Sequence, residues 1–437
     1  MATLLPALGT SIANVALPSL EVAFDASFQA VQWIVVAYLL AVTAMIVSAG
    51  RLGDMFGRRP LLLAGIGLFT VASTLGVLAP NLTLLIAIRA LQGIGAAAMM
   101  SLSVAAVGDI VAKERTGAAM GLLGTVSAIG TAIGPVIGGL LLSWLGWRSL
   151  FGLMAAAGAV SLWAAYATLP ASAPARDRAQ FDWIGTLLLC ASLGAYALIA
   201  TTGILLSLST IALGILMLLA LTAFLLVESR TAQPMVRLDL LRDPRLTMPL
   251  LAMGLVSAIV MTTLVVGPFF LSRTLGLGVG ATGLVMSVGP VVAALVGAPS
   301  GRLVDRAGAA TVSRIGLVGV MLGSLLMMVL PGVLAVIGYT LALATITAGY
   351  ALFQAANTTI VMAGLPPDRR GVVSGLLGLS RNIGLITGAA AMGSLFAAIA
   401  VSGLGPIPPG GAAGLVAAFA MATGLAALSL ILVWAPR

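Results

Sequence analysis

Apolar runs of about 20 residues recur along the whole chain, separated by short stretches rich in polar and charged residues. A run of that length crosses the hydrocarbon core of a bilayer as an α-helix. Runs such as "LLLAGIGLFTVASTLGVLA" do not alternate between apolar and polar positions, which argues against a membrane-spanning β-barrel. The pattern predicts fourteen spans, over residues 2–20, 29–49, 60–79, 82–108, 117–144, 149–169, 183–202, 204–227, 246–270, 278–299, 310–330, 333–362, 371–400 and 412–434.

Composition supports an all-α polytopic membrane protein. Of the 437 residues, 61% are hydrophobic and only 8% are charged, so a soluble domain would have no polar surface to present to water. The single cysteine, Cys190, excludes a disulfide framework, and the absence of histidine removes the usual metal ligand. We therefore expect no metal site and no cofactor.

The distribution of basic residues predicts the topology. With the N-terminus in the cytoplasm, most of the 21 Lys and Arg residues fall on cytoplasmic segments. Only Arg148 and Arg273 fall outside, and Arg89 and Arg381 lie within spans. This positive-inside bias predicts a multi-pass protein of the cell (inner, or cytoplasmic) membrane with both termini in the cytoplasm. It also accounts for the net charge of +9 without a nucleic-acid partner.

The second half of the chain copies the first. "GRLGDMFG", beginning at Gly50, matches "GRLVDRAG", beginning at Gly301, and "ERTGAAMGLLGTVSAIGTAIG" matches "DRRGVVSGLLGLSRNIGLITG" further along. The repeat predicts an N-terminal six-span bundle over residues 1–170, an inserted pair of spans over 171–245, and a C-terminal six-span bundle over 246–437. Parallel six-span repeats are the architecture of transporters that work by rocking.

Charge is concentrated in "GRLGDMFGRRP", between the second and third spans. The arginines lie where positive charge favours the cytoplasmic face, and Asp54 can pair with Arg58 or Arg115. The glycines permit a tight turn between the two spans. A loop that only sets topology would explain the arginines, but neither Asp54 nor the duplicated spacing.

Four features together resemble the fourteen-span drug:proton antiporter family of major facilitator transporters. They are "GRLGDMFGRR", "RALQGIG" in the fourth span, "NVALP" at the end of the first, and the glycine pattern of the fifth span. The resemblance implies a major facilitator fold with two additional helices, and export of drugs or metabolites by antiport with protons. It also implies a latch at the cytoplasmic face that holds the outward-facing state. The latch residues are Asp54, Arg58, Arg59, Arg115, Asp305 and Arg306.

The fifth span carries the antiporter motif that this resemblance identifies. Gly130, Gly134 and Gly138 are four residues apart and form a thin stripe on one helix face, which allows close approach of another helix. Pro135 lacks an N–H and is expected to bend the helix. Tight packing alone would explain the stripe, whereas the resemblance adds a role in shaping the cavity. The motif residues are Gly121, Gly130, Gly134, Pro135, Gly138 and Gly139.

Several polar side chains lie inside the predicted spans. Arg89 and Arg381 each cost about 2.5–3.5 kcal/mol to insert, so we expect them to face a partner or a water-filled cavity. For the neutral residues, an interhelical hydrogen bond is an equally good explanation. The predicted lining of a central cavity comprises Asn14, Arg89, Gln92, Gln354, Asn357 and Arg381.

Carboxylates are absent from the middle of the spans. Where the resemblance implies an aspartate in the first span, this chain has Gly9. Asp25 and Asp182 are interpreted as helix N-caps of the second and seventh spans. A lipophilic cation would find no anionic partner mid-membrane and would be repelled by two arginines, which favours a neutral or anionic substrate.

The leading hypothesis is a proton-coupled secondary exporter that works as a monomer on a small-molecule substrate. One alternative is a facilitated carrier or importer of an organic anion on the same fold. Another is a non-transporting receptor or scaffold. An enzyme is disfavoured because the sequence shows no nucleophile–base pair, metal cluster or nucleotide-binding loop.

Overall fold

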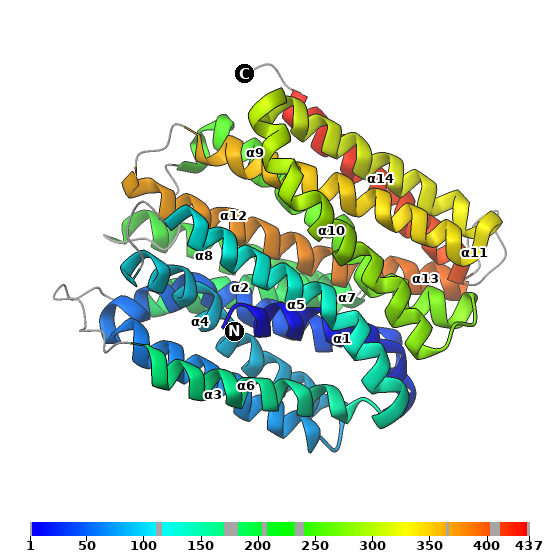
Figure 1. The fold of residues 1–437 in the computed structure, drawn as a ribbon, viewed down its shortest axis with the longest axis horizontal. Helices are drawn as coiled ribbons and strands as arrows, with labels where there is room; N and C mark the ends of the chain where they lie inside the picture. The colour runs from blue at the N-terminus through cyan, green and yellow to red at the C-terminus, as the bar shows by residue number, and fades with distance from the viewer. Residues whose placement is uncertain are drawn as a thin grey trace. The chain divides into compact units, whose positions relative to one another are not determined.

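The computed structural model describes residues 2–110, 116–169, 182–202, 208–231, 240–363, 367–402 and 411–434, and the regular structure within them is helical (Figure 1). The first six helices are α1 (Leu4–Ala23), α2 (Phe28–Phe56), α3 (Arg58–Val77), α4 (Leu82–Ile110), α5 (Thr116–Leu145) and α6 (Arg148–Thr168). They are followed by α7 (Trp183–Thr202) and α8 (Leu208–Arg230).

The second half begins with a short 3₁₀ turn, η2 (Leu240–Arg242), followed by α9 (Pro244–Phe269) and a π-helical turn, η3 (Phe270–Thr274). Next are α10 (Val279–Ala307) and α11 (Ala309–Met362). The chain continues through α12 (Pro367–Thr387), a second π-helical turn η4 (Gly388–Met392), α13 (Gly393–Ser402) and α14 (Gly411–Trp434).

The predicted spans are confirmed as helices. Each coincides with a helix, with one arm of α11, or with the continuous series α12–η4–α13. Within the described residues, 11 helices are long and apolar enough to cross a membrane. One of these is α11, whose 54 residues are divided at Ala335, where φ is 47° and ψ is −122°. Its arms correspond to the predicted spans 310–330 and 333–362.

The chain divides into two compact units. One comprises Met1–Tyr196 with Ala212–Met235, and the other comprises Ala197–Ile211 with Val236–Arg437. In the first unit α1 packs on α5, α4 packs on α2 and α3, and α3 packs on α6. In the second unit α9 packs on α12, α10 on α11, and α11 on α14. The pairings of the first unit therefore recur in the second.

Glycine contacts in the third and fourth spans of each half reveal the repeat in detail. A Cβ at Gly95 would lie 2.6 Å from the Gly65 carbonyl oxygen, so α3 and α4 touch through their backbones. In the second unit, a Cβ at Gly316 would lie 2.7 Å from the Gly349 oxygen, and the reverse contact is equally short. Gly65 and Gly316 are separated by the same interval as Gly50 and Gly301, so both pairs occupy equivalent places in the two repeats.

The turn after the second span of each half also recurs. Gly57 separates α2 from α3 with φ of 94°, and Gly308 separates α10 from α11 with φ of 82°. These are conformations that residues with a Cβ rarely adopt. The prediction that glycine permits a tight turn between the second and third spans is confirmed, and the structure shows the same turn in the second copy.

One predicted cap is wrong and another is confirmed. The side chain that caps α2 belongs to Ser27, whose hydroxyl accepts a hydrogen bond from the Ala30 N–H at 3.3 Å. Asp25 lies two residues further out, in the preceding turn, with φ of 46°, too far away to cap the helix. Asp182 does cap α7, because its Oδ1 accepts a hydrogen bond from the Gly185 N–H at 2.8 Å.

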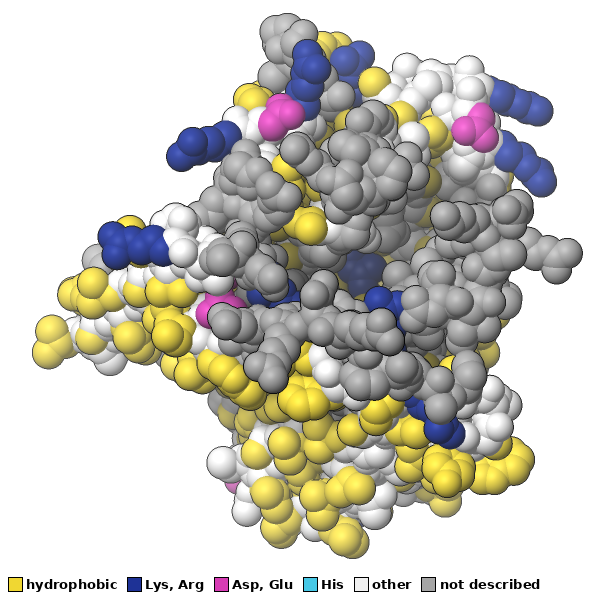
Figure 2. Space-filling view, turned by 90° about the vertical axis from the view of Figure 1, so that its left-hand side faces the viewer, with side chains coloured by type: hydrophobic (Ala, Val, Ile, Leu, Met, Phe, Trp, Pro, Cys, Tyr) yellow, Lys and Arg dark blue, Asp and Glu magenta, His cyan; other side chains and the backbone are white. Residues whose placement is uncertain are grey.

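The surface follows the division expected of a membrane protein. In Figure 2, Lys and Arg side chains lie among the helix ends that face the viewer, and apolar side chains gather on the left and in the lower part of this view. Large apolar residues such as Trp163, Leu208 and Leu295 are mostly exposed. In a bilayer these side chains would contact lipid rather than water.

Candidate functional site

Arg89 on α4 is completely buried inside the first unit. Its Nε donates to the Ile34 carbonyl on α2 at 3.0 Å, and its Nη2 donates to the Gly9 carbonyl on α1 at 3.0 Å. Its guanidinium carbon lies 4.3 Å from the centroid of the Tyr38 ring. Arg89 therefore joins three helices through backbone acceptors and a cation–π contact, which compensate for burial of its charge.

Gln92 extends this arrangement toward α3. Its Oε1 accepts a hydrogen bond from Arg89 Nη1 at 2.8 Å, and its Nε2 donates to the Ser73 hydroxyl at 2.7 Å. The spacing of three residues on α4 places the two side chains on one face. The expectation that both face a central cavity stays a prediction, because the structure places their hydrogen-bond partners within the first unit.

Sequence reasoning missed Tyr38 in this cluster. The Tyr38 hydroxyl donates to the Pro6 carbonyl on α1 at 2.9 Å, and its ring faces Arg89. A tyrosine inside a span was the available signal, because its hydroxyl needs a partner in the membrane. We refer to Arg89, Gln92, Ser73 and Tyr38 as the Arg89 cluster.

The second unit has no copy of the Arg89 cluster at the equivalent positions. The intervals of the sequence repeat place Gly289 opposite Tyr38 and Leu343 opposite Arg89. In the structure, a Cβ at Gly289 would lie 3.6 Å from Leu343 Cδ1. The first unit thus has an aromatic ring in contact with an arginine, whereas the second unit has a glycine next to a leucine at the equivalent positions. The two units therefore differ in chemistry at this place.

One buried asparagine in each unit has a carbonyl oxygen without a hydrogen-bond partner in the described part of the chain. Asn14 on α1 donates to the Thr10 carbonyl at 3.0 Å, and Asn357 on α11 donates to the Pro249 carbonyl on α9 at 3.1 Å. The Oδ1 atoms of both side chains are buried and accept no hydrogen bond there. Such acceptors need water or a donor group from elsewhere.

Arg381 on α12 differs from Arg89. It is half-buried, and among the described residues it forms no hydrogen bond. Tyr350 on α11 interacts electrostatically with Arg381 and hydrogen-bonds to Ser257 on α9. Gln354, also half-buried, follows Tyr350 by one helical turn and shares its face. The sequence analysis did not identify Tyr350. Like Tyr38, it is a tyrosine inside a predicted span, where its hydroxyl needs a hydrogen-bond partner.

The glycine stripe of α5 allows the close approach of another helix, as predicted, and the structure shows that this helix is α1. A Cβ at Gly130 would lie 2.7 Å from the Leu4 carbonyl oxygen, and one at Gly138 would lie 2.9 Å from Ile12 Cγ1. A Cβ at Gly134 would collide with the Ser11 hydroxyl. Pro135 and Gly139 are buried beside the stripe, and α5 continues as a helix through Pro135. The surroundings of Gly121 lie outside the described residues.

The corresponding helices of the second unit make the same contact. Gly384 on α12 lies against the Gly254 carbonyl on α9, and Gly388, in η4, lies against the Ala258 carbonyl. The sequence repeat had already placed Gly384 and Gly388 opposite Gly130 and Gly134. Both units therefore bring their first and fifth spans together through the same pair of glycines.

The predicted latch residues are placed only in part. The Asp54 side chain and Arg115 lie outside the described residues. Arg58 and Arg59 begin α3, and Arg59 Nη2 donates to the Tyr166 carbonyl at the end of α6 at 2.9 Å. Asp305 and Arg306 end α10 with exposed side chains that form no ion pair among the described residues. The latch itself stays a prediction.

Two repeated bundles of membrane spans, each with glycine contacts between its first and fifth spans, have the architecture of transporters that work by rocking. The Major Facilitator Superfamily profile matches residues 1–389, and the chain belongs to this superfamily of membrane transporters. It is therefore a multi-pass membrane transporter, as the sequence resemblance implied, and not an enzyme.

Its relatives include named drug transporters. The chain is 34% identical over 396 residues to the multidrug resistance protein Stp of Mycobacterium tuberculosis, covering 89% of this chain and 72% of Stp. It is 30% identical to the riboflavin transporter RibZ of Clostridioides difficile, covering 89% and 84%. The structure of the nucleoside transporter NupG matches with a TM-score of 0.70 at 14% identity, covering 99% of this chain and 98% of NupG, which reflects the shared fold.

Proposed function

We propose that this protein is a secondary exporter of drugs or metabolites that works by rocking alternating access and couples export to proton entry. Its substrates are neutral or anionic rather than lipophilic cations. It resides in the cytoplasmic membrane with both termini in the cytoplasm, and works as a monomer. The relationship to Stp supports export of drugs.

The half-buried cation of Arg381 is the observation that carries the substrate class. Its guanidinium has no hydrogen bond in the described residues, so its donors are available to an anionic or carbonyl-bearing substrate. Arg89, by contrast, already donates to three acceptors. Gln354 and the unpaired Oδ1 of Asn357 add polar groups for a neutral substrate. The similarity to a riboflavin transporter agrees with this, because riboflavin is not a cation.

The cytoplasmic cluster of Asp54, Arg58, Arg59, Arg115, Asp305 and Arg306 is proposed as the latch between the two states. The duplicated aspartates Asp54 and Asp305, each with arginines close by in the sequence, support this role, because charge pairs at the cytoplasmic rim can be made and broken as the halves rock. Asp54→Asn should slow transport without preventing substrate binding. Unchanged transport by Asp54→Asn would contradict the latch role of this aspartate.

Transport in proteoliposomes tests the proposal. The purified protein is reconstituted, a pH gradient is imposed, and movement of the anionic dye fluorescein is compared with that of the quaternary dye ethidium. We expect uphill movement of fluorescein, its loss in Arg381→Gln, and its retention in Arg273→Gln, which removes one charge from the same unit. Pumping of ethidium with fluorescein ignored would contradict the substrate class. Downhill movement that ignores the pH gradient would indicate a facilitated carrier.

A further inference from the structure

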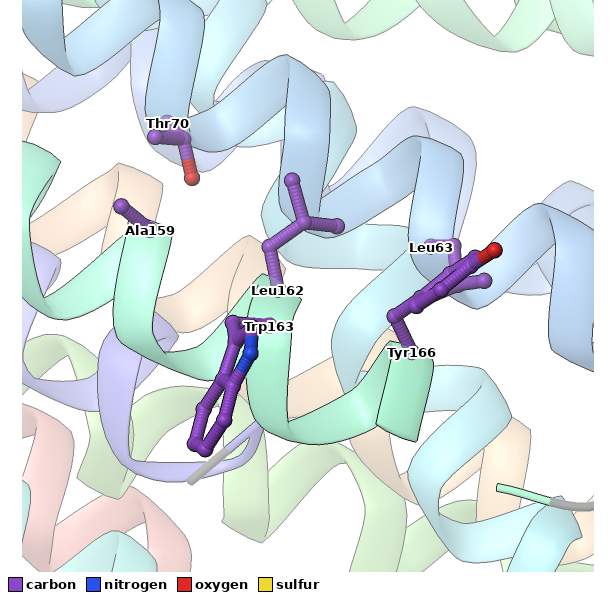
Figure 3. Close-up of a pocket in the computed structure, with 6 residues that line it drawn as sticks. All are labelled: Leu63, Thr70, Ala159, Leu162, Trp163 and Tyr166. Atoms are coloured by element: carbon purple, nitrogen blue, oxygen red, sulfur yellow. The ribbon is translucent and has the colours of Figure 1, made fainter. Parts of the chain in front are cut away.

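Each unit has an apolar region on its outer surface. In the first unit a hollow lies between α3 and α6 and is lined by Leu63, Thr70, Ala159, Leu162, Trp163 and Tyr166 (Figure 3). The Thr70 hydroxyl already donates to the Ile66 carbonyl at 2.7 Å. A lining of this kind contacts any hydrocarbon chain and does not distinguish one lipid from another.

In the second unit the apolar region lies on α11 and α14, which pack against each other. Both helices are long and apolar enough to cross a membrane. Large apolar side chains at helical spacing, each between 44% and 66% exposed, cover their outer sides: Ile315, Val318 and Leu322 on α11, and Leu428, Ile431 and Trp434 on α14. In a bilayer these side chains contact lipid.

A cation lies at one end of this apolar surface. The guanidinium carbon of Arg314 lies 4.9 Å from the centroid of the Trp434 ring. Arg314 is in the first two turns of α11, and Trp434 is the last residue of α14. The contact therefore joins a charge and an aromatic ring at the end of two spans, the depth at which lipid headgroups meet a membrane protein.

The charge of Arg314 has no neutralising partner among the described residues. Its side chain is half-buried and makes no hydrogen bond or ion pair there. Nε is buried, but the two Nη groups reach the surface. Arg89 and Arg148 also contact aromatic rings, yet both donate to backbone carbonyls as well. A ring attracts a cation without cancelling its charge, so the Nη donors of Arg314 are available to an anion.

We infer that this surface binds a phospholipid with an anionic headgroup. The headgroup phosphate accepts hydrogen bonds from the Nη groups of Arg314, and an acyl chain lies along the exposed apolar side chains of α11 and α14. A zwitterionic headgroup binds less well, because it brings its own cation to the same place. The occupant is a lipid of the leaflet in which α11 begins. The site lies on the outside of one unit, so it does not depend on the substrate or on proton coupling.

Quenching of Trp434 fluorescence tests the inference. The full chain is reconstituted in phosphatidylcholine vesicles that contain a fixed minor fraction of a lipid brominated near the carbonyl end of its acyl chain. This lipid is either phosphatidylglycerol or phosphatidylcholine. The Trp434 component is the difference between the unmodified protein and Trp434→Phe, which keeps a ring for Arg314. We expect about fivefold tighter association of the anionic lipid, the effect of one basic residue near a membrane surface.

Three variants test the role of the charge. Arg314→Gln should remove the preference for the anionic lipid, and Arg314→Lys should retain it. Arg302→Gln is the matched control and should also retain it, because it removes an exposed charge from the neighbouring α10 that contacts no ring among the described residues. The preference compares two lipids in the same variant, so a changed environment of Trp434 cancels. Gel filtration shows whether each variant is folded.

Equal association of the two lipids with the unmodified protein would overturn the inference. So would a preference that persists in Arg314→Gln, or one that Arg302→Gln removes equally, since the anionic lipid would then respond to the overall charge of the surface. A Trp434 component that neither lipid quenches would also overturn it, because another occupant, such as a second copy of the chain, would then cover this surface.

Discussion

Gly134→Ala is predicted to force α5 away from α1. The added Cβ would collide with the Ser11 hydroxyl and lie 3.0 Å from Ser11 Cβ and 3.3 Å from the Ile12 nitrogen. Overpacking of this kind costs about 1–3 kcal/mol in the free energy of unfolding. The collision is chiefly with one side-chain oxygen, so it can be removed by a second substitution.

Ser11→Ala should relieve most of this cost. Among the described residues, its hydroxyl makes only long hydrogen bonds, to the Leu8 carbonyl at 3.3 Å and the Gly130 carbonyl at 3.5 Å. Loss of such bonds inside a membrane protein costs about 0.6 kcal/mol. Because the two residues touch, we expect the double variant to be about 1–2 kcal/mol more stable than the sum of the single effects.

Two further glycines make the experiment specific. Gly130→Ala places its Cβ 2.7 Å from a backbone oxygen, that of Leu4, so Ser11→Ala should not rescue it. Gly67→Ala has no neighbour within 4 Å and should be neutral. Unfolding is followed by tryptophan fluorescence in detergent micelles titrated with dodecyl sulfate. Additivity of Ser11→Ala with Gly134→Ala, or equal stability of Gly134→Ala and Gly67→Ala, would refute this account of the α1–α5 contact.

Three other predictions concern the same bundles. Arg89→Lys should lower the free energy of unfolding by about 1.5–3 kcal/mol in the same titration. One ammonium group cannot reach the Ile34 carbonyl, the Gly9 carbonyl and Gln92 together. A variant as stable as the unmodified protein would contradict this. Gly57→Ala and Gly308→Ala should each cost about 1–2 kcal/mol in thermal unfolding, because both sites have positive φ; an effect at only one site would mean that the two turns are not equivalent. Tyr38→Phe should lower the free energy of unfolding by about 1 kcal/mol, because the hydrogen bond to the Pro6 carbonyl is lost. Tyr38→Leu should lower it further, because the ring in contact with Arg89 is also removed. Equal stability of the two variants would exclude the cation–π contribution.

The spans and the glycine stripe were predictable from sequence because each depends on residue type and spacing alone. A 20-residue apolar run has one stable outcome in lipid, and glycines four apart lie on one face whatever surrounds them. Gly130, Gly134 and Gly138 accordingly contact α1. The cap of α2 was misassigned to Asp25 because two candidate capping residues lie close together, and only backbone geometry selects Ser27.

The partners of Arg89 could not be predicted because two of them are backbone carbonyls. Every residue has a carbonyl, so Ile34 and Gly9 carry no signal in the sequence. Gly9 is informative here, because the resemblance implies a carboxylate at that position and the structure places its carbonyl oxygen 3.0 Å from Arg89 Nη2. The π-helical turns at Phe270–Thr274 and Gly388–Met392 also lack a sequence signature.

The two repeats agree at the glycine contacts between their third and fourth spans and differ at most positions of the Arg89 cluster. Gly65 and Gly95 correspond to Gly316 and Gly349, because replacing any of them would push two helices apart. At the positions of Tyr38 and Arg89, by contrast, the second unit has Gly289 and Leu343, and its own intramembrane arginine is Arg381. The repeated glycines are needed for the helices of each bundle to pack. Folding alone does not require Arg89 and Arg381 to differ in burial and in partners. We therefore expect substrate specificity to follow the residues that break the repeat. Replacing Leu343 with a polar residue should then alter the range of substrates. A substitution at one of the repeated glycines that leaves the protein folded should alter this range less.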